Sequence, residues 1–368
     1  SPTYDPDLMV GRQRNNNYAN MLHNQRQPQF NRAVKAKYPP GSTFKLVQGL
    51  IGLQEKVLRP SDRYPCNMGF SYGKRKMACH AHSSPLDLRD AVAHSCNAYF
   101  CYVFRDMITN SKYGSVKEGV RVWNDYVYSF GFGRQLGTDL YGEGAGFVPT
   151  PEYYDSRYSS SWNWGTVISC AIGQGEMGCT PLQMANLAAI VANRGYYYIP
   201  HVVKHIDGRD SLDSRFYEKH YAMVDREHYE PIIDGMWGTV HREIGTAGVA
   251  YVEGLDICGK TGTTTSAKDR WFCGFTGYYT AAVWCGYKYG EEIRLVGNTT
   301  NPAGRLWKKV MQPLHKGKSS EPLYDEDNFI RIEVCLDCGN LATDNCRLDP
   351  RTKLVFLVIY IVALFTAG

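Results

Sequence analysis

Three short polar motifs contain the residues of this 368-residue chain that are best suited to covalent chemistry. The first is Ser42-Thr43-Phe44-Lys45, at the start of a predicted helix. Residues three apart lie on one face of a helix, one turn from each other. A buried lysine with a lowered pKa can accept the proton of a serine hydroxyl, which makes the serine a nucleophile. The first N–H groups of the helix would also stabilise a developing oxyanion.

The second motif is Ser95-Cys96-Asn97. A hydroxyl and an amide two residues apart can face one cleft from a short loop between helices. We expect Ser95 to relay a proton from Lys45 to a leaving amine, and Asn97 to hold a substrate amide.

The third motif is Lys260-Thr261-Gly262-Thr263, at the end of an apparent strand. A cation, two hydroxyls and a glycine that permits close approach to the backbone suit a substrate carboxylate. The N–H of Thr263 would be the second oxyanion donor. Taken alone, each motif also fits an ordinary capped helix, loop or polar turn.

Together, and in this order, the motifs resemble those of penicillin-binding proteins and β-lactamases. The resemblance to the penicillin-binding transpeptidase family covers nearly all of residues 1–315. It is strengthened by segments that flank the motifs, namely Asn31-Arg32-Ala33, Tyr38-Pro39-Pro40-Gly41, Ala171-Ile172-Gly173-Gln174-Gly175-Glu176 and Thr180-Pro181-Leu182-Gln183-Met184-Ala185. These segments are similar to class B enzymes of the elongation type, as found in Bacteroidota.

The part of the chain after Lys260 resembles bifunctional class A enzymes instead. The segments concerned are Asp269-Arg270-Trp271-Phe272-Cys273-Gly274-Phe275, Val283-Trp284-Cys285-Gly286 and Val334-Cys335-Leu336-Asp337-Cys338-Gly339-Asn340-Leu341-Ala342-Thr343. The class of the enzyme is therefore less well defined than its catalytic motifs.

The resemblance implies a peptidoglycan D,D-transpeptidase that acts through a Ser42 acyl-enzyme and is inhibited by β-lactams. A D,D-carboxypeptidase, a serine β-lactamase and a non-catalytic β-lactam sensor domain share the motifs and remain alternatives. The resemblance also implies stem peptides and β-lactams as ligands, a glycan polymerase of the SEDS type as partner, and a place on the periplasmic face of the bacterial inner membrane. Catalysis would require no cofactor.

The pattern of apolar residues predicts helices followed by strands. Helices are expected over 40–56, 86–108, 181–192 and 231–240, and strands over 255–260, 271–278 and 281–287. This order indicates an α+β fold. The family resemblance implies a β-lactamase/transpeptidase-like arrangement, with a central antiparallel sheet of about five strands flanked by helices.

Composition and charge separate the chain into three parts. Residues 1–315 are expected to form the transpeptidase domain, truncated at its N-terminus, with any membrane anchor outside this fragment. Residues 316–352 read as an acidic, cysteine-containing extension, and 353–368 as an apolar segment. The uncharged run is shorter than the roughly 18–20 residues that span a bilayer, so it is either a buried element or a truncated membrane helix. A net charge of +5 without a dense basic block predicts no nucleic-acid partner.

Cysteine and histidine cluster between the first two motifs. A structural zinc site is one interpretation, with candidate ligands Asp62, Cys66, Cys79, His80 and His82. A Cys66–Cys79 disulfide and unpaired thiols are the alternatives. Cys335, Cys338 and Cys346 favour a disulfide in the tail over a metal site.

Overall fold

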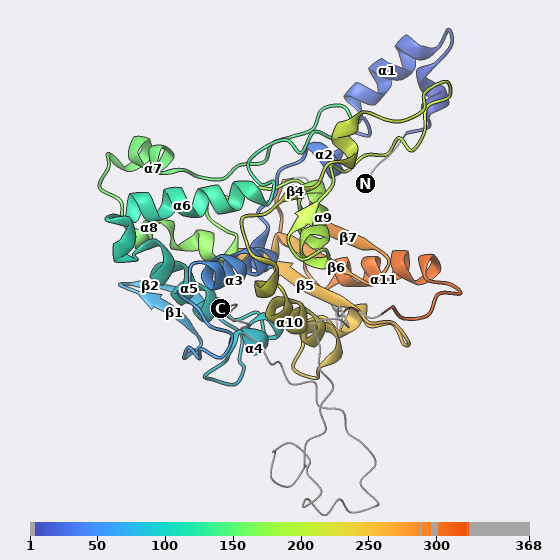
Figure 1. Ribbon diagram of the computed structural model, residues 1–368. Coiled ribbons are helices and arrows are strands. Elements are labelled where there is room, and N and C mark those ends of the chain that lie inside the picture. Colours follow the sequence, from blue (N-terminus) through green and yellow to red (C-terminus); the bar gives the residue numbers. More distant parts are fainter. Residues whose placement is uncertain (1–3, 288, 296–300, 322, 324–368) are drawn as a thin grey trace, which may run out of the picture. The chain divides into compact units, whose positions relative to one another are not determined.

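Helices outnumber strands in the computed structural model, which describes residues 4–287, 289–295, 301–321 and 323 (Figure 1). The α-helices are α1 (Arg14–His23), α2 (Arg32–Lys35), α3 (Lys45–Gln54), α4 (Leu88–Ala93), α5 (Asn97–Ile108), α6 (Val116–Ser129), α7 (Pro151–Tyr158), α8 (Trp164–Val167), α9 (Pro181–Ala192), α10 (Glu230–His241) and α11 (Pro302–Leu314). Within the described residues, every helix is too short or too polar to cross a bilayer.

The strands form three antiparallel groups. The largest is a three-stranded sheet in the order β5 (Cys258–Thr263), β6 (Asp269–Phe275) and β7 (Thr280–Gly286). Two short pairs lie apart from it, β1 (Gly69–Tyr72) with β2 (Arg75–Ala78) and β3 (Tyr196–Tyr197) with β4 (His220–Tyr221). The α+β class is confirmed. The expected sheet of about five strands has three strands among the described residues, and each corresponds to one strand predicted from the sequence.

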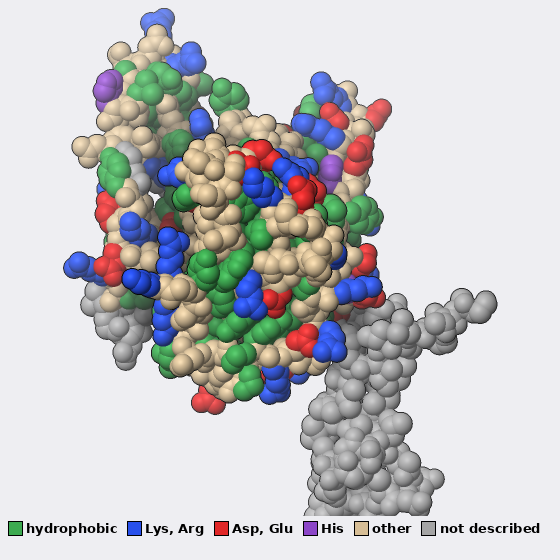
Figure 2. All heavy atoms as spheres, turned by 90° about the vertical axis from the view of Figure 1, so that its left-hand side faces the viewer, with side chains coloured by type: hydrophobic (Ala, Val, Ile, Leu, Met, Phe, Trp, Pro, Cys, Tyr) green, Lys and Arg blue, Asp and Glu red, His purple; other side chains and the backbone are tan. Residues whose placement is uncertain are grey.

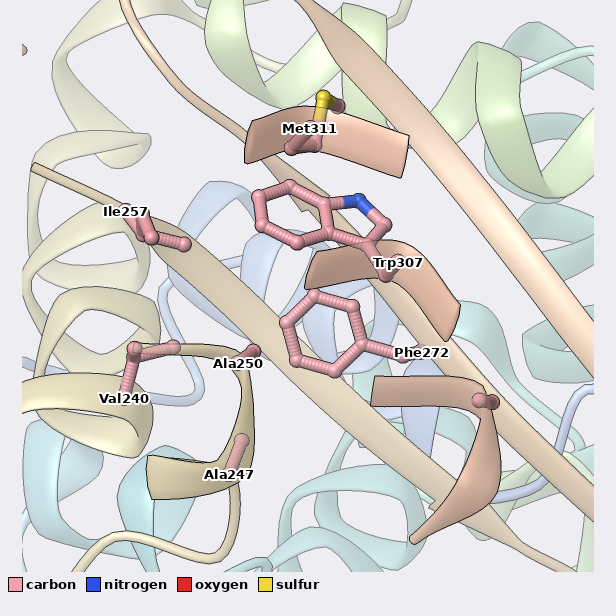
Figure 3. Packing of buried hydrophobic residues seen from close by; sticks show 8 residues of the cluster. Val240, Ala247, Ala250, Ile257, Phe272, Trp307 and Met311 are labelled. Atoms are coloured by element: carbon pink, nitrogen blue, oxygen red, sulfur yellow. The ribbon is translucent and has the colours of Figure 1, made fainter. Parts of the chain in front are cut away.

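Both faces of this sheet are covered. Neighbouring residues of a strand point to opposite faces, and Trp271 and Phe272 of β6 are both fully buried. On the Phe272 face, the ring of Trp307 from α11 packs 5.1 Å from the Phe272 ring, centroid to centroid (Figure 3). On the other face, the indole N–H of Trp271 donates to the carbonyl of Pro39, 2.9 Å away. The sheet is thereby fixed to the segment that leads into Ser42.

The predicted helix over 86–108 is two helices with a break at Ser95. The side chain of Asp87 accepts a hydrogen bond from the N–H of Asp90 and caps α4. Ser95 has φ of +57°, a left-handed conformation that ends α4. The Cys96 thiol then accepts from the N–H of Tyr99 and caps α5. The break places the second motif at the start of a helix.

Six described α-helices were not predicted, namely α1, α2, α6, α7, α8 and α11, and the sequence holds a signal for α6 and α11. In α6, the buried residues Val120, Trp123 and Val127 recur at helical spacing. An ion pair of 2.8 Å between Lys117 and Asp155 links α6 to α7. Figure 2 views the molecule from the side on which α6 and α7 lie, and it shows acidic and basic side chains intermixed with hydrophobic ones there. The α11 helix buries Trp307 and Met311.

Residues 1–320 form one compact unit. The predicted boundary at residue 315 falls at the C-cap of α11. The predicted segments 316–352 and 353–368 lie outside the described residues, apart from 316–321 and 323.

Candidate active site

Ser42 lies in a 3₁₀ turn, Gly41–Phe44, directly before α3. Gly41 has φ of +57°, and its N–H donates to the carbonyl of Gly173 at 2.8 Å. A Cβ at Gly41 would lie 3.2 Å from the carbonyl oxygen of Thr263. The turn therefore rests against the end of β5, and a side chain at position 41 would be strained by the positive φ and would crowd Thr263. This contact brings the first and third motifs together.

Lys45, the first residue of α3, is fully buried and points toward the second motif. Its Nζ donates to the carbonyl of Ser95 at 2.6 Å and to Oδ1 of Asn97 at 2.6 Å. The hydroxyl of Ser95 is 3.2 Å from the same nitrogen. Burial lowers the pKa of Lys45 to about 8, although nearby cysteines partly oppose this shift. A lysine with this pKa is a competent base close to neutral pH.

Asn97 is held from two sides. Its amide Nδ2 donates to the carbonyl of Ala78 in β2 at 2.6 Å, and its Oδ1 accepts from Lys45. Its backbone N–H donates to the thiol sulfur of Cys79 at 3.1 Å. The orientation of the amide is thus determined by the β1–β2 hairpin as well as by α5.

Lys260 is fully buried, and its Nζ donates to the carbonyl of Thr261 at 3.2 Å. Burial, and to a smaller extent the charge of Lys45, holds the pKa of Lys260 well below its usual value. Gly262 lies against the first motif, since a Cβ there would lie 2.9 Å from the carbonyl oxygen of Pro40. Lys260 thus lies behind the surface of the site. From the sequence we expected a cation at the surface that contacts the substrate directly.

A cleft of about 390 Å³ joins the three motifs. Its lining includes five residues predicted from the sequence, Ser42, Ser95, Asn97, Thr261 and Thr263. It also includes Thr246, Arg270 and Asn301, which sequence reasoning missed. Thr246 and Asn301 lie in loops outside the three motifs. The residues around them give no sequence signal of a functional role. Arg270 follows the third motif by seven residues, and only the register of β5 and β6 brings it to the cleft.

A cluster of sulfur and imidazole groups lies behind Asn97. The ligand atoms of Cys66, Cys79, His82 and Cys96 are all within 4.8 Å of one another. His82 Nδ1 is 2.6 Å from the carbonyl of Ser83, which fixes the ring with Nδ1 as the donor. Its Nε2 is then a free acceptor, buried without a hydrogen-bond partner among the described residues.

The cluster contains three of the five predicted metal ligands. Cys66, Cys79 and His82 belong to the cluster, whereas the carboxylate of Asp62 accepts hydrogen bonds from the backbone N–H and Nε of Arg59, at 2.8 and 3.0 Å. His80 lines the cleft instead. The fourth member is Cys96, the central residue of the second motif, which was not among the predicted ligands. Cys66 and Cys79 are free thiols, so the structure lacks the alternative disulfide between them.

Comparison with known proteins finds a family model and relatives that match this chain. A family model described as the penicillin-binding protein transpeptidase domain matches residues 1–301. The chain is 33% identical over 213 residues to the peptidoglycan D,D-transpeptidase MrdA of Acinetobacter baumannii, a match that covers 56% of this chain and 30% of the relative. It is 37% identical over 115 residues to penicillin-binding protein 1A of Clostridium perfringens, which covers 31% of this chain and 14% of that protein.

Among solved structures, PBP2 of Pseudomonas aeruginosa in complex with WCK 5153 is similar with a TM-score of 0.67. The identity is 24%, and the match covers 95% of this chain and 72% of that one. This likeness supports the fold. The chain spans less than half the length of the curated relatives it matches.

Proposed function

Because this chain belongs to the penicillin-binding protein transpeptidase family, we propose that it is a peptidoglycan D,D-transpeptidase that acts through Ser42. The observation that carries the proposal is the convergence of the motifs on one cleft. Ser42 lines this cleft beside Thr263, and the buried amine of Lys45 is held by Ser95 and Asn97.

In the acylation step, Ser42 Oγ forms a bond to the carbonyl carbon of the penultimate D-Ala of a stem peptide. Its proton passes to the neutral amine of Lys45. The C–N bond to the terminal D-Ala then breaks, and the leaving amine receives that proton from Lys45 through the hydroxyl of Ser95. The 3.2 Å contact between Lys45 Nζ and Ser95 Oγ supports this relay.

In the transfer step, an amine of a neighbouring stem peptide attacks the Ser42 ester. The ester C–O bond breaks, an amide forms, and the proton lost by the amine returns to Ser42. The backbone N–H groups of Ser42 and Thr263 are our candidates for the oxyanion donors. A β-lactam would acylate Ser42 in the same way, with opening of its ring amide.

Intact-mass spectrometry with benzylpenicillin tests the nucleophile. We expect a stable adduct on the wild type and none on Ser42→Ala. An adduct of equal yield on both proteins would place the nucleophile elsewhere. Rapid multiple turnover of a chromogenic cephalosporin would instead favour a β-lactamase. Cross-linking of donor and acceptor stem peptides separates a transpeptidase from a carboxypeptidase and from a sensor.

We also propose that Cys66, Cys79, His82 and Cys96 hold a structural zinc ion. Three thiols and one imidazole form a donor set that zinc binds tetrahedrally, and the free Nε2 of His82 lacks any other described partner. In the catalytic scheme given above, the metal takes no part in the reaction. Protein purified without added metal should contain about one zinc per chain, and a folded protein that contains no zinc would contradict the proposal.

The proposed substrate determines the location. Stem peptides lie outside the inner membrane, so we place the domain on its periplasmic face, near a glycan polymerase of the SEDS type. Cell fractionation and co-purification with that polymerase test these two points, and recovery of the protein only from the cytosol would contradict the first.

A further inference from the structure

A second cavity, of about 490 Å³, shares no lining residue with the active-site cleft and has no part in the catalytic scheme. Its volume is within the roughly 300–1,000 Å³ of cavities that hold small molecules. Three tyrosines line it, Tyr128 of α6, Tyr197 of β3 and Tyr221 of β4. We call it the tyrosine cavity.

Hydrogen bonds tie the two sides of the tyrosine cavity to each other. Ser129, the last residue of α6, donates from its hydroxyl to the carbonyl of Tyr126 at 2.6 Å. The same oxygen accepts from the N–H of Met223 at 2.9 Å. Met223 follows β4 by two residues. The end of α6 is thereby joined to the paired strands β3 and β4, so the cavity lies between elements that are fixed to one another.

Aromatic rings form much of the wall. The rings of Tyr197 and His220, a cross-strand pair of β3 and β4, stack with their centroids 5.2 Å apart and 24° between their planes. The guanidinium of Arg134 lies over the ring of Tyr128, 5.3 Å from its centroid. The side chain of Tyr221 is 66% exposed, so its ring is accessible to a ligand. Such amphipathic rings suit ligands that have an apolar face and a polar edge.

Charged side chains of both signs complete the lining. Asp125 lies one turn before Tyr128 on the same face of α6, and Arg134 follows this helix. Both residues are exposed, and among the described residues neither side chain has a hydrogen-bond or ion-pair partner. Asp125 offers acceptors and Arg134 offers donors. Because their formal charges cancel, the cavity favours a neutral ligand rich in hydrogen-bonding groups over a phosphate or an ammonium group.

We infer that the tyrosine cavity binds a sugar ring of an N-acetylated glycan, the polymer to which stem peptides are attached; the identity of this polymer rests on the proposed function. A pyranose has an apolar C–H face that packs on an aromatic ring, and hydroxyls at its edge that Asp125 and Arg134 can bind. The thioether of Met223, 53% exposed, offers a flexible apolar surface for an N-acetyl methyl group. A second site on the same polymer would raise the local concentration of stem peptides at Ser42.

Isothermal titration calorimetry with tetra-N-acetylchitotetraose tests the inference. Tyr221→Ala should weaken binding about 3- to 10-fold, as expected for loss of one aromatic contact. Asp125→Ala should weaken it about 10- to 100-fold, as expected for loss of a hydrogen bond to a charged group. Tyr221→Trp keeps an aromatic ring and should retain the affinity of the wild type. Tyr217→Ala, at a tyrosine that is 59% exposed outside the cavity, is the matched control and should change nothing.

Three outcomes would overturn the inference. The first is no detectable binding of the probe by the wild type, and the second is an unchanged affinity in both Tyr221→Ala and Asp125→Ala. The third is equally tight binding of maltotetraose, which lacks N-acetyl groups. The probe carries no stem peptide, so its binding does not depend on acylation. A wild type that binds the probe but is not acylated at Ser42 would support the sugar site and refute the proposed function, so the two failures are distinguishable.

Discussion

Nζ of Lys45 lies 2.6 Å from Oδ1 of Asn97, so the lysine of the first motif is held by the side chain that also anchors the β1–β2 hairpin. The contact joins α3 to α5 at the bottom of the cleft. Because Asn97 offers Lys45 a neutral oxygen, it supports the amine without stabilising its charged form as a carboxylate would.

The rate of acylation should rise with pH and level off above about pH 8. Lys45 must be neutral to accept the proton of Ser42, and burial lowers its pKa to about 8. Each pH unit below 8 should therefore lower the rate about tenfold, because the neutral fraction falls by that factor. Stopped-flow acylation by a fluorescent penicillin between pH 6 and 9 measures this profile. A rate independent of pH would rule out Lys45 as the base.

Asn97→Asp should move this pH profile upward by about one unit or more. A carboxylate at the position of Oδ1 would favour the charged form of Lys45, so a higher pH is needed to deprotonate it. Asn20→Asp, at an exposed position of α1, is the matched control and should leave the midpoint unchanged. The same midpoint in Asn97→Asp and the wild type would show that the amide does not influence the base.

Gly41→Ala should slow acylation severely. Its Cβ would lie 3.2 Å from the Thr263 carbonyl oxygen, so Ser42 or β5 must move. Gly114 also has positive φ, but a Cβ there would have no atom within 4 Å, so Gly114→Ala is the matched control. Both variants should lose about 1–2 kcal/mol of unfolding free energy from the left-handed backbone. Equal acylation rates in the two variants would contradict the close contact.

Cys96→Ser should lower the zinc content and the melting temperature. A serine at this position still caps α5, because its hydroxyl can accept from the N–H of Tyr99. The loss is therefore confined to one metal ligand. Cys170→Ser, a buried cysteine outside the cluster, should retain its zinc. Elemental analysis and thermal unfolding give the two readouts, and an unchanged zinc content in Cys96→Ser would remove this residue from the ligand set.

Trp307→Ala should lower the free energy of unfolding by about 3–5 kcal/mol. Trp307 is fully buried against Phe272, and its indole N–H donates to the carbonyl of Ala281. Leu306→Ala removes a neighbouring side chain of α11 that is 45% exposed, and should cost less than about 1 kcal/mol. Urea denaturation of both variants tests this. A small loss for Trp307→Ala would mean that α11 contributes little to the stability of the sheet.

The sequence predicted where the candidate residues lie on their elements when this depends on local spacing. Ser42 and Lys45 are one turn apart, and the polar run after Lys260 ends a strand, so residue types and periodicity were sufficient to place them. It could not reveal that Lys260 is buried, because that depends on how β5 packs against the turn before α3. Arg270 depends on strand register, and Cys96 depends on the backbone conformation of Ser95. These features are tertiary, and no short window of sequence encodes them.

The fold likewise has features that local sequence signals predict and features that depend on tertiary contacts. The predicted helix over 181–192 begins with Pro181 and a capping box of Thr180 and Gln183, all of which are local signals. The β1–β2 hairpin was missed because its strands have four residues each and little apolar alternation. It is held instead by contacts with α5, including the bond from Asn97 to Ala78.

The left-handed backbone of Ser95 restricts which residues position 95 can accept. In a continuous helix, residues two apart project in nearly opposite directions, yet Lys45 contacts both Ser95 and Asn97. The φ of +57° is what permits this. Glycine would adopt that angle freely but has no hydroxyl, and threonine has the hydroxyl but is β-branched, which makes positive φ costly. Serine is the smallest side chain that meets both demands, so substitutional tolerance at this position should be among the lowest in the chain.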